Sequence, residues 1–322
     1  MTKREDWRNS VLFCPINRDQ KKCGQSLSAN NKYHSLVIDD VGVFRADIPP
    51  NKDVVFHSRM EKGAALRELQ YQHLHLCYWE TDYYKQVLKR FLKDIDPKGR
   101  VAADIGCGDG RFTELLLEIG FDKVVAVDVD VRPLHELARY AEEKGFREKL
   151  LLIQGSADQR LLKDESIDVA LTIGVLYYLN ERFENGLQCV TRYLKPGGIL
   201  IDSEPDIEGA MLKALFFESL SEYIKIYDEH TFTESHMGEK FRFRLFSRDE
   251  IAAYYEKADL QTVDQHPLSI FPSILRISMV RERFSVEEVA ALESEIRKTF
   301  DYVNRNGRIA KHIIWKTEKK WP

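Results

Sequence analysis

The segment Val101 to Gly110 (VAADIGCGDG) carries the strongest chemical signal in the sequence. An apolar run ends near Asp104, and glycine then occupies every second position, at Gly106, Gly108 and Gly110. Glycines let the chain turn sharply and bring its backbone close to a ligand, and a helix that starts after the turn offers free N–H donors. The segment therefore predicts a turn that binds a polar or anionic ligand.

A second acidic residue follows at a distance typical of nucleoside binding. Asp128 ends the next apolar run and follows Gly110 by 18 residues. A carboxylate at this place can accept hydrogen bonds from two ribose hydroxyls. The dinucleotide pattern GxGxxG is broken, because Arg111 stands where its third glycine would be. We therefore expect a nucleoside-containing ligand, with a nicotinamide-dependent dehydrogenase as the weakest interpretation.

The elements that must position this turn are strands alternating with helices from Arg100 onward. Such alternation is typical of a mostly parallel sheet covered by helices on both faces. The pattern predicts strands over 101–105, 123–128, 150–154, 167–172 and 198–203, and helices over 111–118, 133–144 and 181–193.

The alternation stops after Pro205. A helical stretch over 207–227, with Phe216 and Tyr227 on a face expected to be buried, leads into a polar, histidine-bearing segment that ends near Lys240. This insertion is expected to act as a lid. Two capping boxes, Ser247 with Glu250 and Ser285 with Glu288, then predict helices, and the spans 260–263 and 312–316 read as strands.

The region before Arg100 has a different pattern. Short strands and turns are expected over 9–51, and helical spacing over 60–93 ends at a Pro-Gly turn. A length of 322 residues allows about two domains. We divide the chain into an N-terminal accessory region (1–97), a core (98–205 and 246–322) and a helical insertion (206–245).

The sequence resembles the class I S-adenosylmethionine-dependent methyltransferases. Besides the DxGxGxG turn, it has three later motifs of that family, namely GSAD at 155–158, Asp168 with GVLYY at 174–178, and LKPGG at 194–198. The resemblance covers about 101–203, with a fainter match at 246–263. It implies an α/β fold with a Rossmann-like, seven-stranded, mostly parallel sheet, and S-adenosyl-L-methionine as the cofactor.

The resemblance also implies which residues contact the cofactor. The glycine turn would face the methionine part, an acidic strand end the ribose, and the GSAD segment the adenine, although Ser156 stands where many members have an acidic residue. The next strand end would border the transferring methyl, and an aromatic residue of the preceding helix would cover the cofactor. The expected set is Tyr78, Asp104, Gly106, Gly108, Gly110, Asp128, Val129, Ala157, Asp158 and Gly174.

Methyl transfer from a sulfonium is an in-line displacement with an activated donor. Alignment then does much of the catalysis, and a base is needed only for a poorly nucleophilic acceptor. Candidates for a base or for a group that positions the acceptor are Tyr177, Glu204, Tyr227, His230 and His236. The alternatives are simple packing for Tyr177 and solvent-facing loop positions for the two histidines.

Composition and charge limit the acceptor. With 43% hydrophobic and 31% charged residues the chain is an ordinary globular protein, and its net charge of −4 offers little attraction to RNA. We favour a small-molecule acceptor, attacked through oxygen, nitrogen or carbon, in a pocket under the insertion. The alternatives are an RNA methyltransferase that docks through the slightly basic N-terminal region, and a cofactor-binding scaffold without catalysis.

No apolar run approaches the ~18 residues of a membrane span, and the polar start lacks a secretory signal, so a cytoplasmic protein is expected. Five scattered cysteines without a CxxC pair favour reduced thiols. Cys14, Cys23 and His34 resemble part of the zinc ribbon of guanine-methylating ribosomal RNA enzymes, but Asn17 occupies the place of one ligand. A zinc site needs four ligands, so no metal is expected.

Overall fold

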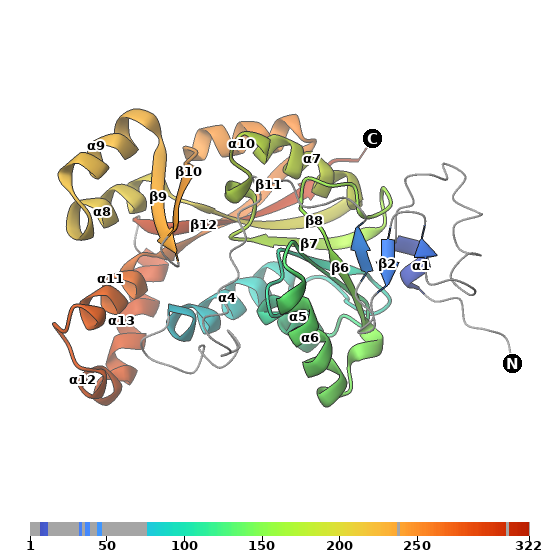
Figure 1. Ribbon diagram of the computed structural model, residues 1–322, viewed down its shortest axis with the longest axis horizontal. Helices are drawn as coiled ribbons and strands as arrows, with labels where there is room; N and C mark the ends of the chain where they lie inside the picture. The colour runs from blue at the N-terminus through green and yellow to red at the C-terminus, as the bar shows by residue number, and fades with distance from the viewer. Residues whose placement is uncertain are drawn as a thin grey trace, which may run out of the picture.

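The computed structural model of the chain describes residues 7–11, 32–33, 36–38, 44–46, 76–236, 239–306 and 309–321. Its centre is one sheet with the strand order β1-β2-β3-β6-β5-β4-β7-β8-β12-β11, and helices lie on both faces of this sheet (Figure 1). The residues Cys14, Cys23 and His34 lie outside the described part.

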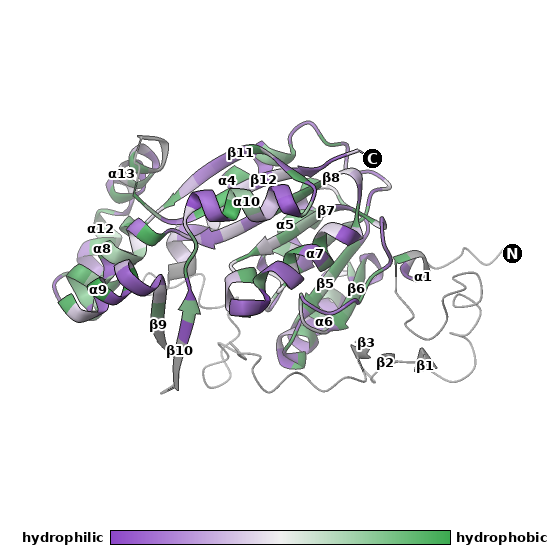
Figure 2. Ribbon diagram, turned by 90° about the horizontal axis from the view of Figure 1, so that it is seen from above, coloured by the Kyte–Doolittle hydropathy of each residue, from purple (hydrophilic) through white to green (hydrophobic). Residues whose placement is uncertain are grey.

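Five neighbouring strands in the middle of the sheet are parallel, namely β6 (Leu150–Gln154), β5 (Val124–Asp128), β4 (Ala102–Ile105), β7 (Ile167–Ile173) and β8 (Leu194–Pro205). They are rich in apolar residues because both of their faces are covered (Figure 2). Next to β8, β12 (Ala310–Lys319) runs antiparallel, and β11 (Leu260–Ser269) is antiparallel to β12. These seven strands confirm the expected α/β fold.

Three short strands extend the sheet at its other edge. They are β1 (Lys32–Tyr33), β2 (Leu36–Ile38) and β3 (Phe44–Ala46), and β3 pairs in parallel with β6. Helix α1 (Arg8–Val11) lies near the same edge, where the Arg8 guanidinium donates to the carbonyl of Leu150 at 3.0 Å. The N-terminal segment thus adds strands to the sheet of the core, and the division into accessory region, core and insertion stays a prediction.

Two apolar clusters hold the layers together. On one face, α4 (Leu76–Leu92), α5 (Arg111–Ile119) and α6 (Val131–Lys144) pack on the strands. On the other face, α7 (Phe183–Tyr193) and α10 (Arg248–Lys257) do so. Two 3-10 segments, η1 (Arg147–Lys149) and η2 (Leu176–Arg182), precede β6 and α7.

The segment after β8 differs from the expected single helical stretch. It forms α8 (Ile207–Phe217) and α9 (Leu220–Glu229), because Ser219 starts a new helix by accepting a hydrogen bond from the Glu222 N–H at 3.1 Å. The polar segment forms a hairpin of β9 (Thr231–His236) and β10 (Glu239–Arg244). Phe216 and Tyr227, expected on a buried face, are 61% and 66% exposed.

Both predicted capping boxes are present, at the starts of α10 and α12 (Val286–Ala291). The predicted helix after Ser285 is divided, since α13 (Glu293–Asn306) begins after Leu292. Helix α11 (Phe271–Val280) was not expected from the sequence, and it packs with α12 and α13 against the start of α4 through Trp79, Met279, Val289 and Phe300. None of the described helices has the length and apolar character to cross a membrane.

Gly209 provides a test of how α8 is seated on the sheet. A Cβ added there would lie 1.8 Å from the carbonyl oxygen of Ala310 in β12. Neither backbone can move far without disturbing the pairing of β12, so we expect Gly209→Ala to lower the free energy of unfolding by about 1–3 kcal/mol. Guanidinium unfolding measures this loss, with the exposed neighbour Glu208→Ala as the control. Equal midpoints for the two variants would contradict the close contact.

Candidate functional site

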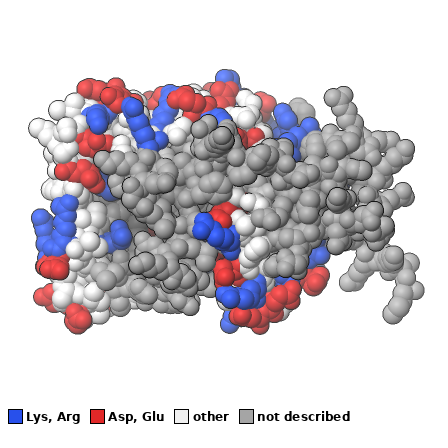
Figure 3. Space-filling model, viewed as in Figure 1, with Lys and Arg blue, Asp and Glu red and all other residues white. Residues whose placement is uncertain are grey.

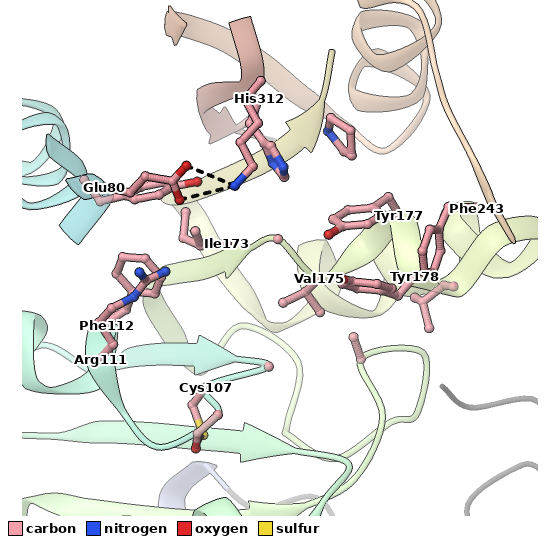
Figure 4. Close-up of a pocket in the computed structure, with 18 of the residues that line it drawn as sticks. Glu80, Cys107, Arg111, Phe112, Ile173, Val175, Tyr177, Tyr178, Phe243 and His312 are labelled. Carbon is pink, nitrogen blue, oxygen red and sulfur yellow. Dashed lines mark hydrogen bonds and ion pairs between the residues drawn. The ribbon is translucent and has the colours of Figure 1, made fainter. Parts of the chain in front are cut away.

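A cavity of about 400 Å³ lies where the parallel strands end. Its walls come from the turns after β4, β5, β6 and β7, from α4, and from α8, the β9–β10 hairpin, α11 and β12. Ligands of open α/β sheets bind at this edge because the loops that follow the strands converge there. Figure 4 shows Tyr177 and Phe243 on one side of the cavity, and Glu80, Arg111 and Phe112 on the other.

The glycine turn after β4 forms one end of the cavity. The N–H groups of Gly106 and Cys107 donate to the carbonyl of Val127 in β5, at 2.7 and 2.9 Å. A Cβ on Gly106 would collide with Val175, whereas one on Gly108 would meet no atom within 4 Å. Gly108 therefore presents bare backbone to the open space. Gly110 does not line the cavity, because it packs against Leu137 of α6.

Asp128, at the end of β5, is hydrogen-bonded to this turn. Its carboxylate accepts from the N–H of Gly108 at 2.8 Å and from the N–H of Asp130 at 2.9 Å, and it lines the cavity. Burial raises the pKa of Asp128 to about 6. Asp104 lies behind the turn, where it accepts from the Thr113 hydroxyl at 2.6 Å, and burial raises its pKa to about 6 as well.

Val129 and Ala157, expected to contact the cofactor, line the cavity beyond Asp128. Asp158 does not, because its carboxylate pairs with Arg182 and accepts a hydrogen bond from the Ser156 hydroxyl. Ser156 and Arg182 are the residues that line the wall. The Asp158 carboxylate thus holds Ser156 and Arg182 at the cavity surface but does not reach that surface itself.

Gly174 and Tyr177 line the middle of the cavity, after β7. Tyr177 is buried among aromatic rings, with centroids 4.1 Å from Tyr178 and 5.7 Å from Phe243 of β10. The ring of His312 lies 5.9 Å from it, roughly at right angles. Packing and a role at the cavity surface were expected as alternatives for Tyr177. Its position is compatible with both, because the ring packs against other aromatic rings and also faces the cavity.

His312 of β12 is a lining residue that the sequence did not single out. Its Nδ1 lies 3.1 Å from the Ser203 hydroxyl of β8, which lies 3.4 Å from the Tyr84 hydroxyl of α4. Tyr84 and His312 both line the cavity. This chain of hydrogen bonds holds the imidazole ring in one orientation. No local signal could have revealed it, because strand pairing brings together residues 109 positions apart.

Other charged lining residues were also missed, among them Glu80, Lys213, Arg276 and Lys311. Lys311 of β12 binds the Glu80 carboxylate of α4 at 3.0 and 3.2 Å. This pair joins the last strand to the helix before the glycine turn (Figure 4). Lys213 of α8 and Arg276 of α11 line the opposite part of the wall. Their positions depend on how α8 and α11 pack against the rest of the chain.

Several expected site residues lie elsewhere. The Tyr78 hydroxyl donates to Glu293 at 2.7 Å, so this ring belongs to the contact between α4 and α13, and Tyr84, nearly two turns later in α4, faces the cavity. His230 directly follows the last residue of α9. Its Nδ1 lies 3.9 Å from a carboxylate oxygen of Glu250, in a smaller pocket that is separate from the cavity. Tyr227 is exposed, and of His236 only the backbone, in β9, is described.

Glu204 lies in β8 behind the cavity wall and is fully buried. Neither of its carboxyl oxygens has a hydrogen-bond partner among the residues that the structure describes. Burial, with Asp202 two positions away on the same strand, raises the pKa of Glu204 well above its usual range. Asp202 itself accepts from the hydroxyls of Thr172 and Tyr255, both at 2.7 Å. Glu204 is thus a buried acid with a raised pKa that does not line the cavity.

Residues 103–202 match the sequence model of the protein family described as "Methyltransferase domain". The chain is 30% identical over 138 residues to a tRNA U34 carboxymethyltransferase of Desulfotalea psychrophila, covering 43% of this chain and 42% of that protein. It is 31% identical over 121 residues to a ubiquinone biosynthesis O-methyltransferase of Caulobacter vibrioides, covering 36% and 46%. The chain spans less than half the length of these curated relatives.

Solved structures share the fold. A SAM-dependent methyltransferase structure from Methanosarcina mazei superposes with a TM-score of 0.52 at 16% identity, covering 73% of this chain and 98% of that one. At this level of identity the likeness concerns the arrangement of strands and helices alone. The matched segment 103–202 contains the glycine turn, Asp128 and the strands β5 to β7, which form one end of the cavity.

Glu204 generates a prediction on stability. An acid whose pKa is higher in the folded than in the unfolded chain costs stability at pH values above its ordinary pKa, here 4.5, and this cost disappears as the pH falls. We therefore expect Glu204→Gln to be more stable than the parent chain at pH 8, by about 1–3 kcal/mol, and the difference to shrink toward pH 5.

Urea unfolding at both pH values measures the effect, with the exposed Glu208→Gln as the control. A constant difference between Glu204→Gln and the parent chain would show that Glu204 titrates normally in the folded protein.

Proposed function

We propose that this chain, whose residues 103–202 form a methyltransferase domain of the class I, S-adenosylmethionine-dependent kind, methylates a small molecule enclosed in the cavity. The observation that carries the proposal is the continuity of this cavity. It runs from the glycine turn to a chamber with apolar walls, which come from Phe232, Phe243 and Leu245 of the insertion region, from Ile270 just before α11 and from Ile277 within it. A cavity of this size with apolar side chains in its walls suits a small organic acceptor.

The residues at the glycine end fit the cofactor. Gly108 and Gly174 leave open space where side chains would otherwise stand, and Asp128 presents two carboxylate oxygens beside them. In our proposal Asp128 accepts hydrogen bonds from the ribose hydroxyls, and Val129 and Ala157 enclose the adenine. When bound, S-adenosylmethionine supplies a methyl group that a positively charged sulfur has activated for transfer.

The residues of the chain would contribute to methyl transfer by positioning the acceptor and by excluding water. Tyr177 and Phe243 would hold the acceptor in line with the methyl group, and the bound acceptor would displace solvent from the cavity. His312 is the lining residue suited to take a proton from the acceptor, since the contact of its Nδ1 with Ser203 orients the ring at the cavity wall. This assignment replaces Glu204 and His230 as the candidate base, and the role of His236 stays a prediction.

The surface charge supports a small molecule over RNA. On the face shown in Figure 3, basic and acidic side chains are interspersed over the described part of the chain. The net charge is −4. Binding to RNA depends on gathered cations that neutralise phosphates. On this face of the described part, a nucleic-acid acceptor would therefore have to be held by contacts other than a broad basic surface.

Asp128 provides a direct test of the cofactor site. Loss of its carboxylate leaves ribose hydroxyls without partners, so we expect Asp128→Ala to weaken S-adenosylhomocysteine binding by about 1–3 kcal/mol in calorimetry. The exposed variant Asp122→Ala is the control. Because the pKa of Asp128 is about 6, the affinity of the parent chain should fall as the pH is lowered through 6. If the affinity of Asp128→Asn for S-adenosylhomocysteine fell with pH in the same way, a group other than Asp128 would cause the pH dependence.

The acceptor is tested with labelled methyl transfer. The purified chain is incubated with methyl-labelled S-adenosylmethionine and, in separate reactions, a pool of metabolites and bulk RNA. We expect label in a small molecule, and a loss of rate of about a hundredfold in His312→Gln because proton transfer is impaired. Label in RNA alone would refute the small-molecule acceptor. Bound S-adenosylhomocysteine without label in either pool would favour a non-catalytic scaffold.

A further inference from the structure

Arg111, the first residue of α5, lines the cavity directly after the glycine turn and is partly buried. Its guanidinium carbon lies 4.3 Å from the centroid of the Phe112 ring and 5.5 Å from that of the Tyr84 ring in α4. One guanidinium nitrogen donates to the Thr81 hydroxyl at 3.4 Å, which is a long hydrogen bond. Two aromatic rings and one hydroxyl therefore hold this cation at the cavity wall (Figure 4).

The guanidinium of Arg111 has no carboxylate partner within the described part of the chain. Two other cations of the cavity wall do have one, since Lys311 binds Glu80 and Arg182 binds Asp158. Aromatic rings attract a guanidinium but offer no lone pairs to its N–H donors. Taking a charged group out of water is costly unless an opposite charge and hydrogen bonds replace the lost hydration. Arg111 is therefore suited to bind an anion that enters the cavity.

Acidic side chains around the glycine turn are bonded to other groups. Asp104 accepts from the Thr113 hydroxyl at 2.6 Å, and Asp128 accepts from two backbone N–H groups at 2.8 and 2.9 Å. The Glu114 carboxylate accepts from the hydroxyl of Tyr140 at 2.7 Å. None of these three acids forms an ion pair with Arg111, so their charges do not take the place of a bound anion.

The cofactor, bound as we propose, brings an anion to this place. The sulfur of S-adenosylmethionine carries the adenosyl part, the methyl group and an amino-acid chain that ends in a carboxylate and an ammonium group. With the ribose at Asp128 and the methyl group directed at the chamber beyond Gly174, the amino-acid chain takes the remaining direction, along the glycine turn toward α5. The turn leaves room for it, because a Cβ on Gly108 would meet no atom within 4 Å.

We propose that Arg111 is a specificity-determining residue of the cofactor site, which binds the carboxylate at the amino-acid end of S-adenosylmethionine. A guanidinium can donate two parallel hydrogen bonds to a carboxylate, a geometry that a lysine ammonium does not reproduce. Such a contact selects S-adenosylmethionine over adenosine derivatives that lack this carboxylate. The inference rests on the proposed function, since it concerns the cofactor end of the same cavity.

Two ligands that differ only in the carboxylate test the inference. One is S-adenosylhomocysteine, and the other is its decarboxylated analogue, in which a hydrogen atom replaces the carboxylate. Their affinities for the full chain are measured by calorimetry. We expect the parent chain to bind S-adenosylhomocysteine more tightly than the analogue by about tenfold or more, as hydrogen bonds between charged groups predict.

Variants locate the contact. Arg111→Gln should weaken S-adenosylhomocysteine binding by about tenfold and leave the affinity for the analogue within about twofold of the parent value, so that the preference disappears. Arg111→Lys, which keeps the charge but not the paired donors, should keep part of the preference. Arg139→Gln, an exposed change of equal charge on α6, is the control and should keep all of it.

Two results with Arg111→Gln would overturn the inference. An equal loss of affinity for both ligands would mean that Arg111 only supports the structure of the turn. An unchanged preference for S-adenosylhomocysteine would assign the carboxylate to another group. Binding of the analogue by Arg111→Gln also reports that this variant is folded.

The same titrations separate the two proposals. If the parent chain binds neither ligand, the proposed function itself fails. If the parent chain binds both ligands with equal affinity, the proposed cofactor site stands and only the role of Arg111 is refuted.

Discussion

The cavity depends on the bonds that join the glycine turn after β4 to the neighbouring strand β5. The N–H groups of Gly106 and Cys107 donate to Val127, and that of Gly108 donates to Asp128. These bonds hold an otherwise permissive segment in one conformation, and glycine adopts the positive φ angles of 77° and 54° at positions 106 and 108 without steric strain. The open space beside the turn exists because this backbone is held without side chains.

The other end of the cavity depends on long-range packing. Helix α8 lies against β12 because Gly209 lets the two backbones touch, and Lys311 of β12 binds Glu80 of α4. Strand β12 therefore connects the insertion, the sheet and the helix that precedes the glycine turn. The groups proposed to contact the acceptor, among them His312, come from segments that are far apart in the chain, which allows the acceptor chamber to vary while the turn stays the same.

Buried acids surround this arrangement. Burial raises the pKa values of Asp104, Asp128 and Asp202 to about 6 and raises that of Glu204 well above its usual range. The aspartates have hydrogen-bond donors, which compensate for part of the lost hydration, whereas Glu204 has none among the described residues. Such groups are costly to stability, and they gather at the carboxyl ends of the strands, where the cavity lies.

The sequence by itself determined the parallel strands, the glycine turn, Asp128 and the capping boxes, because hydrophobic periodicity, glycine spacing and capping side chains act over a few residues. Only the tertiary structure decided which candidates face the cavity. Tyr78 and Asp158 have partners that turn them away from it, while Lys213, Arg276 and His312 reach it from helix and strand faces. Helix orientation and strand pairing depend on contacts between distant residues, which no local pattern contains.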